Sequence, residues 1–79
     1  MLTTDALGAK RYEIRVPYGK FENIFFVNHK PDSDGKYYIM EDRGRNGIWY
    51  ACTAWWDKPC FDSFIQAVKY LKENICELL

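Results

Sequence analysis

Alternating apolar and charged residues mark the first regular element of this chain. From residue 10 to residue 16, Tyr12, Ile14 and Val16 alternate with charged side chains, a period of two that is typical of a strand with one face in water. Pro17 is expected to end this strand. Residues 1–9 mix small and polar side chains without periodicity, which predicts a flexible N-terminal tail.

Three further strands are predicted between turn signals. Residues 24–30, 36–42 and 48–56 are rich in β-branched and aromatic side chains, the composition that strands favour. The dipeptide Asp34-Gly35 separates the first two of these segments, and Asn46-Gly47 separates the last two. Both dipeptides are typical of tight hairpins. We therefore expect consecutive strands to pair as an antiparallel meander.

A helix is predicted at the C-terminal end. Ser63 is followed three residues later by Gln66, the spacing of a capping box that satisfies free backbone N–H groups at a helix start. Apolar residues then recur at helical spacing on one side, namely Phe64, Ala67, Val68, Leu71 and Ile75. The sequence thus predicts an α+β fold, with an antiparallel sheet of about four strands and one C-terminal amphipathic helix packed on one face. Residues 10–79 are predicted to form a single domain.

Turn length decides which side chains share a face of the predicted sheet, because side chains alternate along a strand. If both turns have two residues, one face carries Ile24, Phe26, Asn28, Tyr37, Ile39, Glu41, Tyr50, Cys52 and Ala54. A loop of three or five residues at either turn would invert this division. We assign this face outward because it carries Glu41 and Asn28, which are costly to bury.

The outward assignment makes four apolar residues a candidate protein-binding patch: Phe26, Tyr37, Ile39 and Tyr50. The alternative is that these side chains are ordinary surface aromatics, because about half of any protein surface is apolar.

Composition narrows the class of protein. Three Trp, six Tyr and five Phe supply large side chains for one core in a chain of 79 residues. The three cysteines, Cys52, Cys60 and Cys76, contain no closely spaced pair, which disfavours a disulfide framework or a zinc site. No secretory signal pattern or membrane-length apolar run is recognised. We therefore expect a cytoplasmic protein with reduced thiols.

Candidate chemistry is sparse. Asp32, Asp34 and Glu41 reproduce part of a calcium-binding loop, but Lys30 occupies the first ligand position and strands flank the segment where helices are required. His29 is the single histidine, and no nucleophile motif surrounds it. We expect no catalytic residues, metal site, cofactor, small-molecule substrate or membrane association.

The second turn segment carries Arg43 and Arg45 next to an aromatic strand, and we include both arginines among the predicted protein-binding residues. Arginines beside stacking aromatics can hold single-stranded nucleic acid, yet eleven basic and eleven acidic residues cancel, which removes the bulk attraction to phosphates. We therefore predict a non-enzymatic protein-binding domain, a small stoichiometric regulator or inhibitor of the kind that phages and other mobile elements encode. Its partner is either a second copy or a larger protein, and single-stranded nucleic acid is the alternative.

Overall fold

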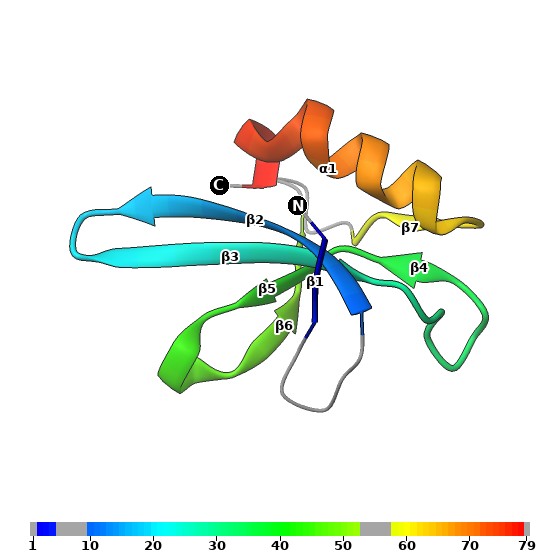
Figure 1. The fold of residues 1–79 in the computed structure, drawn as a ribbon, viewed down its shortest axis with the longest axis horizontal. Helices are drawn as coiled ribbons and strands as arrows, with labels where there is room; N and C mark the ends of the chain where they lie inside the picture. The colour runs from blue at the N-terminus through cyan, green and yellow to red at the C-terminus, as the bar shows by residue number, and fades with distance from the viewer. Residues whose placement is uncertain (1, 5–9, 53–57, 79) are drawn as a thin grey trace.

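The domain consists of an antiparallel sheet with one helix laid across it (Figure 1). The structure is a computed structural model of the 79-residue chain, and it describes residues 2–4, 10–52 and 58–78. The strands and helices are β1 (Leu2–Thr4), β2 (Lys10–Tyr18), β3 (Phe21–Asn28), β4 (Tyr37–Tyr38), β5 (Met40–Asp42), η1 (Gly44–Asn46), β6 (Ile48–Tyr50), β7 (Cys60–Phe61) and α1 (Phe64–Leu78). The predicted α+β fold is confirmed.

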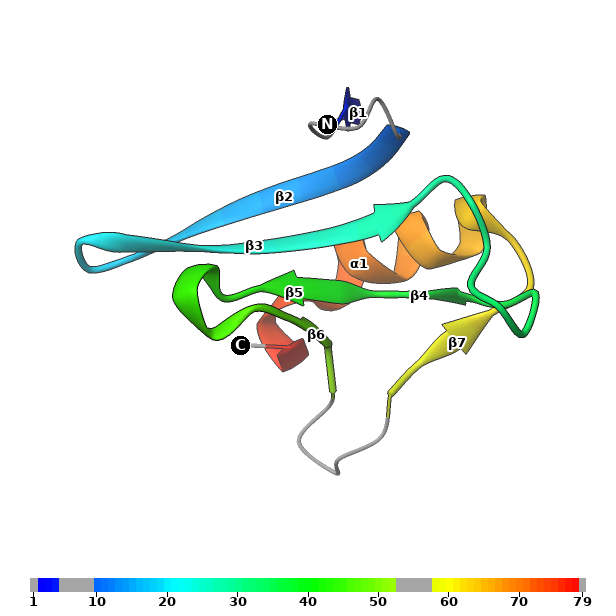
Figure 2. The same cartoon turned by 90° about the horizontal axis from the view of Figure 1, so that it is seen from below.

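Five strands form the main sheet in the order β1-β2-β3-β5-β6, and β4 pairs with β7 in a separate two-stranded ribbon. Figure 2 shows β4 continuing the line of β5 toward β7. Residues 2–4, which we expected to belong to a flexible tail, form β1 and pair with Lys10–Tyr12 of β2. The predicted strand over 48–56 ends at Tyr50, and residues 53–57 lie outside the described residues.

The β2–β3 hairpin is the longest strand pairing in the described sheet. Its register joins Tyr18 to Phe21 across a two-residue turn, so Ile14 lies opposite Phe25. The strand runs through Pro17, where we expected it to end. Proline is tolerated there because β1 pairs only with the start of β2, which leaves this part of β2 as an edge where a missing N–H costs no ladder bond.

Helix α1 begins directly after Ser63, the residue predicted to cap it. The backbone N–H of Gln66 donates to Ser63 Oγ at 3.2 Å, and the N–H of Ala67 donates to the Ser63 carbonyl at 3.2 Å. Ala67 and Leu71 are fully buried, which confirms the predicted apolar stripe over its described part. The backbone leaves helical geometry at Asn74, with φ −125° and ψ 23°.

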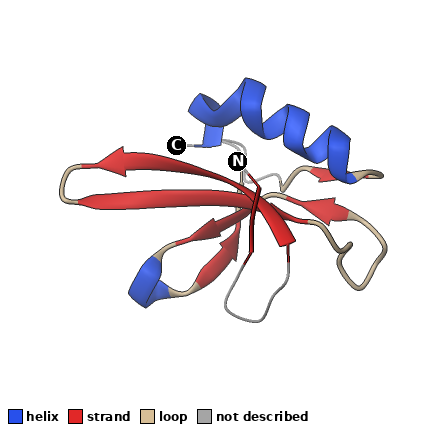
Figure 3. Cartoon of the chain, in the orientation of Figure 1, coloured by secondary structure: helices blue, strands red, loops and turns tan. Residues whose placement is uncertain are grey.

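The core lies between the helix and one face of the sheet (Figure 3). Its buried members are Phe25, Val27, Ile39, Ala51, Ala67 and Leu71. Around them pack partly buried apolar residues, including Tyr12, Ile14 and Val16 from the alternating strand. Helix α1 contacts mainly β3, β4 and β7. In Figure 1, β5 and β6 curve away from the helix.

Both loops invert the register that two-residue turns would impose. Asp42 pairs with Ile48, so the second hairpin has the five-residue loop Arg43–Gly47. In the first loop the register places Phe26 opposite Met40, whereas a two-residue turn would place Phe26 on the same face as Ile39. Ile39 therefore faces the helix, and the predicted outward position of Tyr37 and Ile39 is wrong.

The second loop takes five residues because two glycines adopt left-handed backbone. Gly44 has φ +62° and Gly47 has φ +85°, which other residues rarely adopt. Between them lies one turn of 3₁₀ helix, and Asp42 Oδ1 accepts a 2.9 Å bond from the Gly44 N–H. Asn46 thus belongs to the 3₁₀ turn instead of opening a two-residue hairpin.

Candidate functional site

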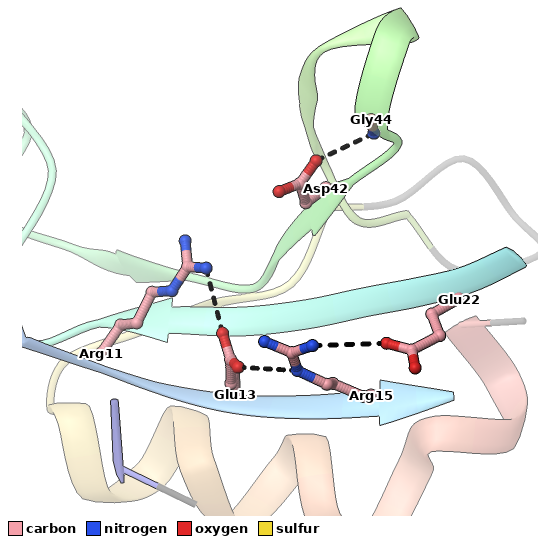
Figure 4. Close-up of polar contacts among 6 residues, drawn as sticks. All are labelled: Arg11, Glu13, Arg15, Glu22, Asp42 and Gly44. Carbon is pink, nitrogen blue, oxygen red and sulfur yellow. Dashed lines mark hydrogen bonds and ion pairs between the residues drawn. The ribbon is translucent and has the colours of Figure 1, made fainter. Parts of the chain in front are cut away.

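Charged side chains cover part of the sheet face that lies opposite the helix. Glu13 on β2 is only 5 % exposed, and Figure 4 shows it between two arginines. Arg11 Nη2 donates to Glu13 at 3.0 Å and Arg15 Nε donates at 3.1 Å. The Arg11 guanidinium also lies 4.3 Å above the Phe26 ring. Phe26, predicted as a contact residue, does face away from the helix but is 3 % exposed beneath this cover.

The ion pairs keep Glu13 ionised despite its burial. Burial alone would raise the pKa of this carboxyl, but the hydrogen bonds and charges of Arg15 and Arg11 lower its pKa below the ordinary value of 4.5. Because a buried charge is tolerated only when it is paired, the two arginines allow ionised Glu13 to lie buried on this face. They do not offer an open binding surface.

A second polar cluster joins the first loop to β6. The Tyr38 hydroxyl donates to Asp34 Oδ2, and the Tyr50 hydroxyl donates to Asp32 Oδ2. The two tyrosine rings meet edge to face at 5.1 Å. Lys58 Nζ lies 4.4 Å from the Tyr50 ring centroid and 5.3 Å from that of Tyr38, within cation–π range.

Hydrogen bonding makes both tyrosines weaker acids. The bond to Asp34 raises the pKa of Tyr38 to about 12, and the bond to Asp32 raises the pKa of Tyr50. A phenol with a raised pKa is less readily deprotonated, so neither tyrosine is activated as a nucleophile or base at neutral pH. The cluster therefore positions Tyr50 against Asp32 and Lys58.

The partial calcium-loop pattern does not assemble as a metal site. Its Asp32 and Asp34 carboxylates accept the tyrosine bonds, and Glu41 accepts bonds from Arg43 instead. Over the described ranges 2–4, 10–52 and 58–78, no group of three or more His, Cys, Asp or Glu could hold a metal ion. His29 lies just beyond β3 with its ring 5.0 Å from Phe64.

Arg43 at the β5–β6 tip is held in place. Its Nε and Nη2 donate to Glu41 Oε2 at 3.1 and 3.0 Å, and its guanidinium lies 5.5 Å from the Trp49 ring centroid. Trp49 Nε1 donates to the Asn46 carbonyl at 2.7 Å, which fixes the indole against the loop.

Arg45, on the same tip, is exposed and forms no ion pair with any described residue. A cleft of about 730 Å³ lies beside the tip and is lined by Arg43 and Arg45 but also by Glu22 and Glu41. The carboxylates balance the arginines, so this cleft has no excess of positive charge.

Strand β6 exposes three large side chains in succession. Ile48 is 57 % exposed, Trp49 52 % and Tyr50 38 %. Alternation along a strand normally buries every second residue. Trp49 faces the helix side of the sheet, but α1 contacts mainly β3, β4 and β7, and about half of the Trp49 side chain stays exposed. Ile48 and Trp49 are therefore candidate contact residues that the sequence patch omitted.

The predicted contact residues other than Phe26 divide into two groups. Tyr50, Arg43 and Arg45 are exposed and lie on or next to the β5–β6 hairpin. Tyr37 is partly buried with its ring edge against Phe64, and Ile39 is 1 % exposed in the core. We define the β6 surface as Ile48, Trp49, Tyr50, Arg45 and Lys58.

Comparisons with known proteins find no matching family model, no matching curated protein and no matching solved structure. Among the described helices, none is long and apolar enough to cross a membrane. Cys52 and Cys60 are both free and exposed.

Proposed function

We propose that this chain is a non-enzymatic protein-binding domain that uses the β6 surface, acting as a small stoichiometric regulator or inhibitor of a larger protein. The observation that supports the proposal is the run of three exposed large side chains on an edge strand of the sheet. Tryptophan and tyrosine are the residues on which binding energy concentrates at protein interfaces. Their position at the edge of a rigid sheet means that little ordering entropy is lost on binding.

Contacts that hold two aromatic side chains of the β6 surface support this proposal. Trp49 is held by Asn46 and Arg43, and Tyr50 is held by Asp32, Tyr38 and Lys58. Side chains that are fixed before binding favour affinity because fewer rotamers are lost in the complex.

Single-stranded nucleic acid receives less support as a partner. Of the two arginines at the hairpin tip, Arg43 forms an ion pair with Glu41. The adjacent cleft carries as many carboxylates as guanidinium groups. A nucleic-acid surface of this size would need several unpaired cations along the strand.

We further propose that the protein works in the cytoplasm, in the manner of the short independent regulators that phages and other mobile elements encode. The free thiols of Cys52 and Cys60 suit a reducing compartment.

The test compares three baits for capture of partners from the cell of origin. Wild type, Trp49→Ala and Ile65→Ala are immobilised in equal amounts, and the retained proteins are quantified by mass spectrometry. Ile65 is the matched control because it is 78 % exposed but lies on the helix. We expect Trp49→Ala to reduce retention of a defined partner at least about tenfold, in line with a hot-spot loss, while Ile65→Ala retains it. Equal retention by Trp49→Ala and wild type, with both variants folded by circular dichroism, would show that the β6 surface is not the binding site.

A further inference from the structure

We propose that the β6 surface binds an extended segment of its partner as an added strand, and that this segment carries acidic residues on both sides of a short apolar stretch. The inference rests on the proposed function and specifies the binding mode and the chemistry of the partner. Two independent features of the strand support it. The first is the direction of its outward backbone groups, and the second is a pair of cations near its ends that form no ion pair with any described residue.

One edge of β6 pairs with no described strand. The N–H of Arg43 donates to the Gly47 carbonyl at 2.9 Å, and the N–H of Ala51 donates to the Ile39 carbonyl at 2.8 Å. Bonded pairs in an antiparallel ladder recur every second residue, so the bonded pair between these two is Glu41 with Trp49. The backbone groups of Ile48 and Tyr50 therefore point away from β5.

This edge is open as far as the structure describes the chain. β6 is the last strand in the sheet order, and no described strand pairs with its outer side (Figure 2). Among the described residues, the Tyr50 carbonyl accepts only a 3.6 Å hydrogen bond from the Cys52 thiol. An edge with two outward residues can exchange backbone hydrogen bonds with one extended segment, which is the mode of strand addition.

One cationic side chain lies toward each end of the apolar centre of the edge. Arg45 precedes β6, and Lys58 lies over the ring of Tyr50 at the other end of the strand. Neither forms an ion pair with any residue in the described ranges. A strand laid along β6 places its ends near these two cations, so carboxylates at both ends are complementary in either strand direction.

The same charges disfavour a second copy of this chain as the occupant. Two β6 strands that pair antiparallel about Trp49 would bring Arg45 of one copy toward Lys58 of the other. Like charges at the two symmetric ends would then oppose association. A partner segment with acidic flanks has no such repulsion.

The experiment is an NMR titration of the ¹⁵N-labelled full chain with synthetic peptides. The probe is the capped peptide Glu-Val-Thr-Val-Thr-Val-Glu, and its matched control carries lysine in place of both glutamates. We expect saturable shifts of the Ile48 and Tyr50 amide signals with the acidic peptide at up to millimolar concentration. Affinity for the lysine peptide should be at least about threefold lower, as two exposed charge pairs predict.

Two variants separate backbone pairing from side-chain contact. Ile48→Ala removes the side chain but keeps the N–H, whereas Ile48→Pro also removes the outward N–H without breaking a bond to β5. We expect Ile48→Pro to bind the acidic peptide at least about threefold more weakly than Ile48→Ala, the effect of one lost hydrogen bond. Equal affinity of the two variants would overturn strand addition.

Other results of these titrations would also contradict strand addition by an acidic segment. No saturable shift with the acidic peptide, or equal affinity for the lysine peptide, would contradict it. Shifts of the Ile48 and Tyr50 amides with protein concentration alone would identify a second copy as the occupant. Saturable shifts of these amides with an oligothymidine, weakening steeply with salt, would identify nucleic acid instead. If Trp49→Ala abolishes partner capture while Ile48→Pro captures as well as Ile48→Ala, the proposed function stands and the strand-addition mode fails.

Discussion

Leu71 is the residue at which the packing of the helix can be tested most sharply. Its side chain is fully buried and joins the core cluster formed with Phe25, Val27 and Ile39. Leu71→Ala removes three carbon groups, which is about 2.4 kcal/mol of transfer free energy at about 0.8 kcal/mol for each. The cavity left against a rigid strand adds to this, so the expected loss of unfolding free energy is about 2–5 kcal/mol.

That loss is large for a chain of this size. Stability of about 0.05–0.15 kcal/mol per residue corresponds to about 4–12 kcal/mol for 79 residues. Urea denaturation followed by far-ultraviolet circular dichroism should therefore show a much lower midpoint for Leu71→Ala with an unchanged slope. Ser63→Ala, which removes the cap acceptor for Gln66, should cost about 0.5–2 kcal/mol.

The matched control is Ile65→Ala on the same helix. Ile65 is 78 % exposed, so its replacement should change stability by less than about 0.5 kcal/mol. If Leu71→Ala costs as little as Ile65→Ala, the helix does not pack through the Ala67–Leu71 stripe and the described core is incorrect.

Three further predictions concern the charged and reactive side chains. Because its arginine partners lower the pKa of Glu13 below 4.5, the stability that ionised Glu13 adds is present above that pH and is lost as pH falls through the folded pKa. Lowering the pH below 4.5 should therefore reduce the difference in unfolding free energy between wild type and Glu13→Gln. The absorbance titration of wild type should show one tyrosine with a pKa of about 12, and Asp34→Asn should lower that value toward 10.0, because Asp34 holds the Tyr38 proton. Alkylation of the native protein should label Cys52 and Cys60; an intramolecular disulfide in the unreduced protein would contradict the cytoplasmic proposal.

Local signals predicted much of this fold. The helix start follows from Ser63 and Gln66, and the buried helix residues follow from apolar spacing, because caps and amphipathic stripes depend on neighbouring residues. The β2 strand follows from its alternation for the same reason. The short strands β1 and β7 could not be predicted, because two or three residues carry no periodicity and gain their order from pairing with distant segments.

The candidate site was predicted only in part, because it depends on loop length. Asn46-Gly47 suggested a two-residue turn, but the left-handed Gly44 and Gly47 enclose a 3₁₀ turn and add three residues. The first loop likewise shifts the register, so that Phe26 pairs with Met40, and this change of parity moves Ile39 into the core. The exposure of Trp49 depends on which strands the helix packs against. Helix packing is a tertiary feature that local sequence patterns do not predict.

Residue-resolved amide exchange on β6 tests the central claim most directly. In the free protein the Trp49 amide, bonded to β5, should exchange slowly, whereas the Ile48 and Tyr50 amides should exchange rapidly because they face the open edge. Addition of the acidic peptide, or of the captured partner, should slow exchange at Ile48 and Tyr50 and leave Trp49 unchanged. Slow exchange of all three amides in the free protein, or no slowing at Ile48 and Tyr50 in the complex, would contradict the account of β6 as a free edge that binds a partner strand.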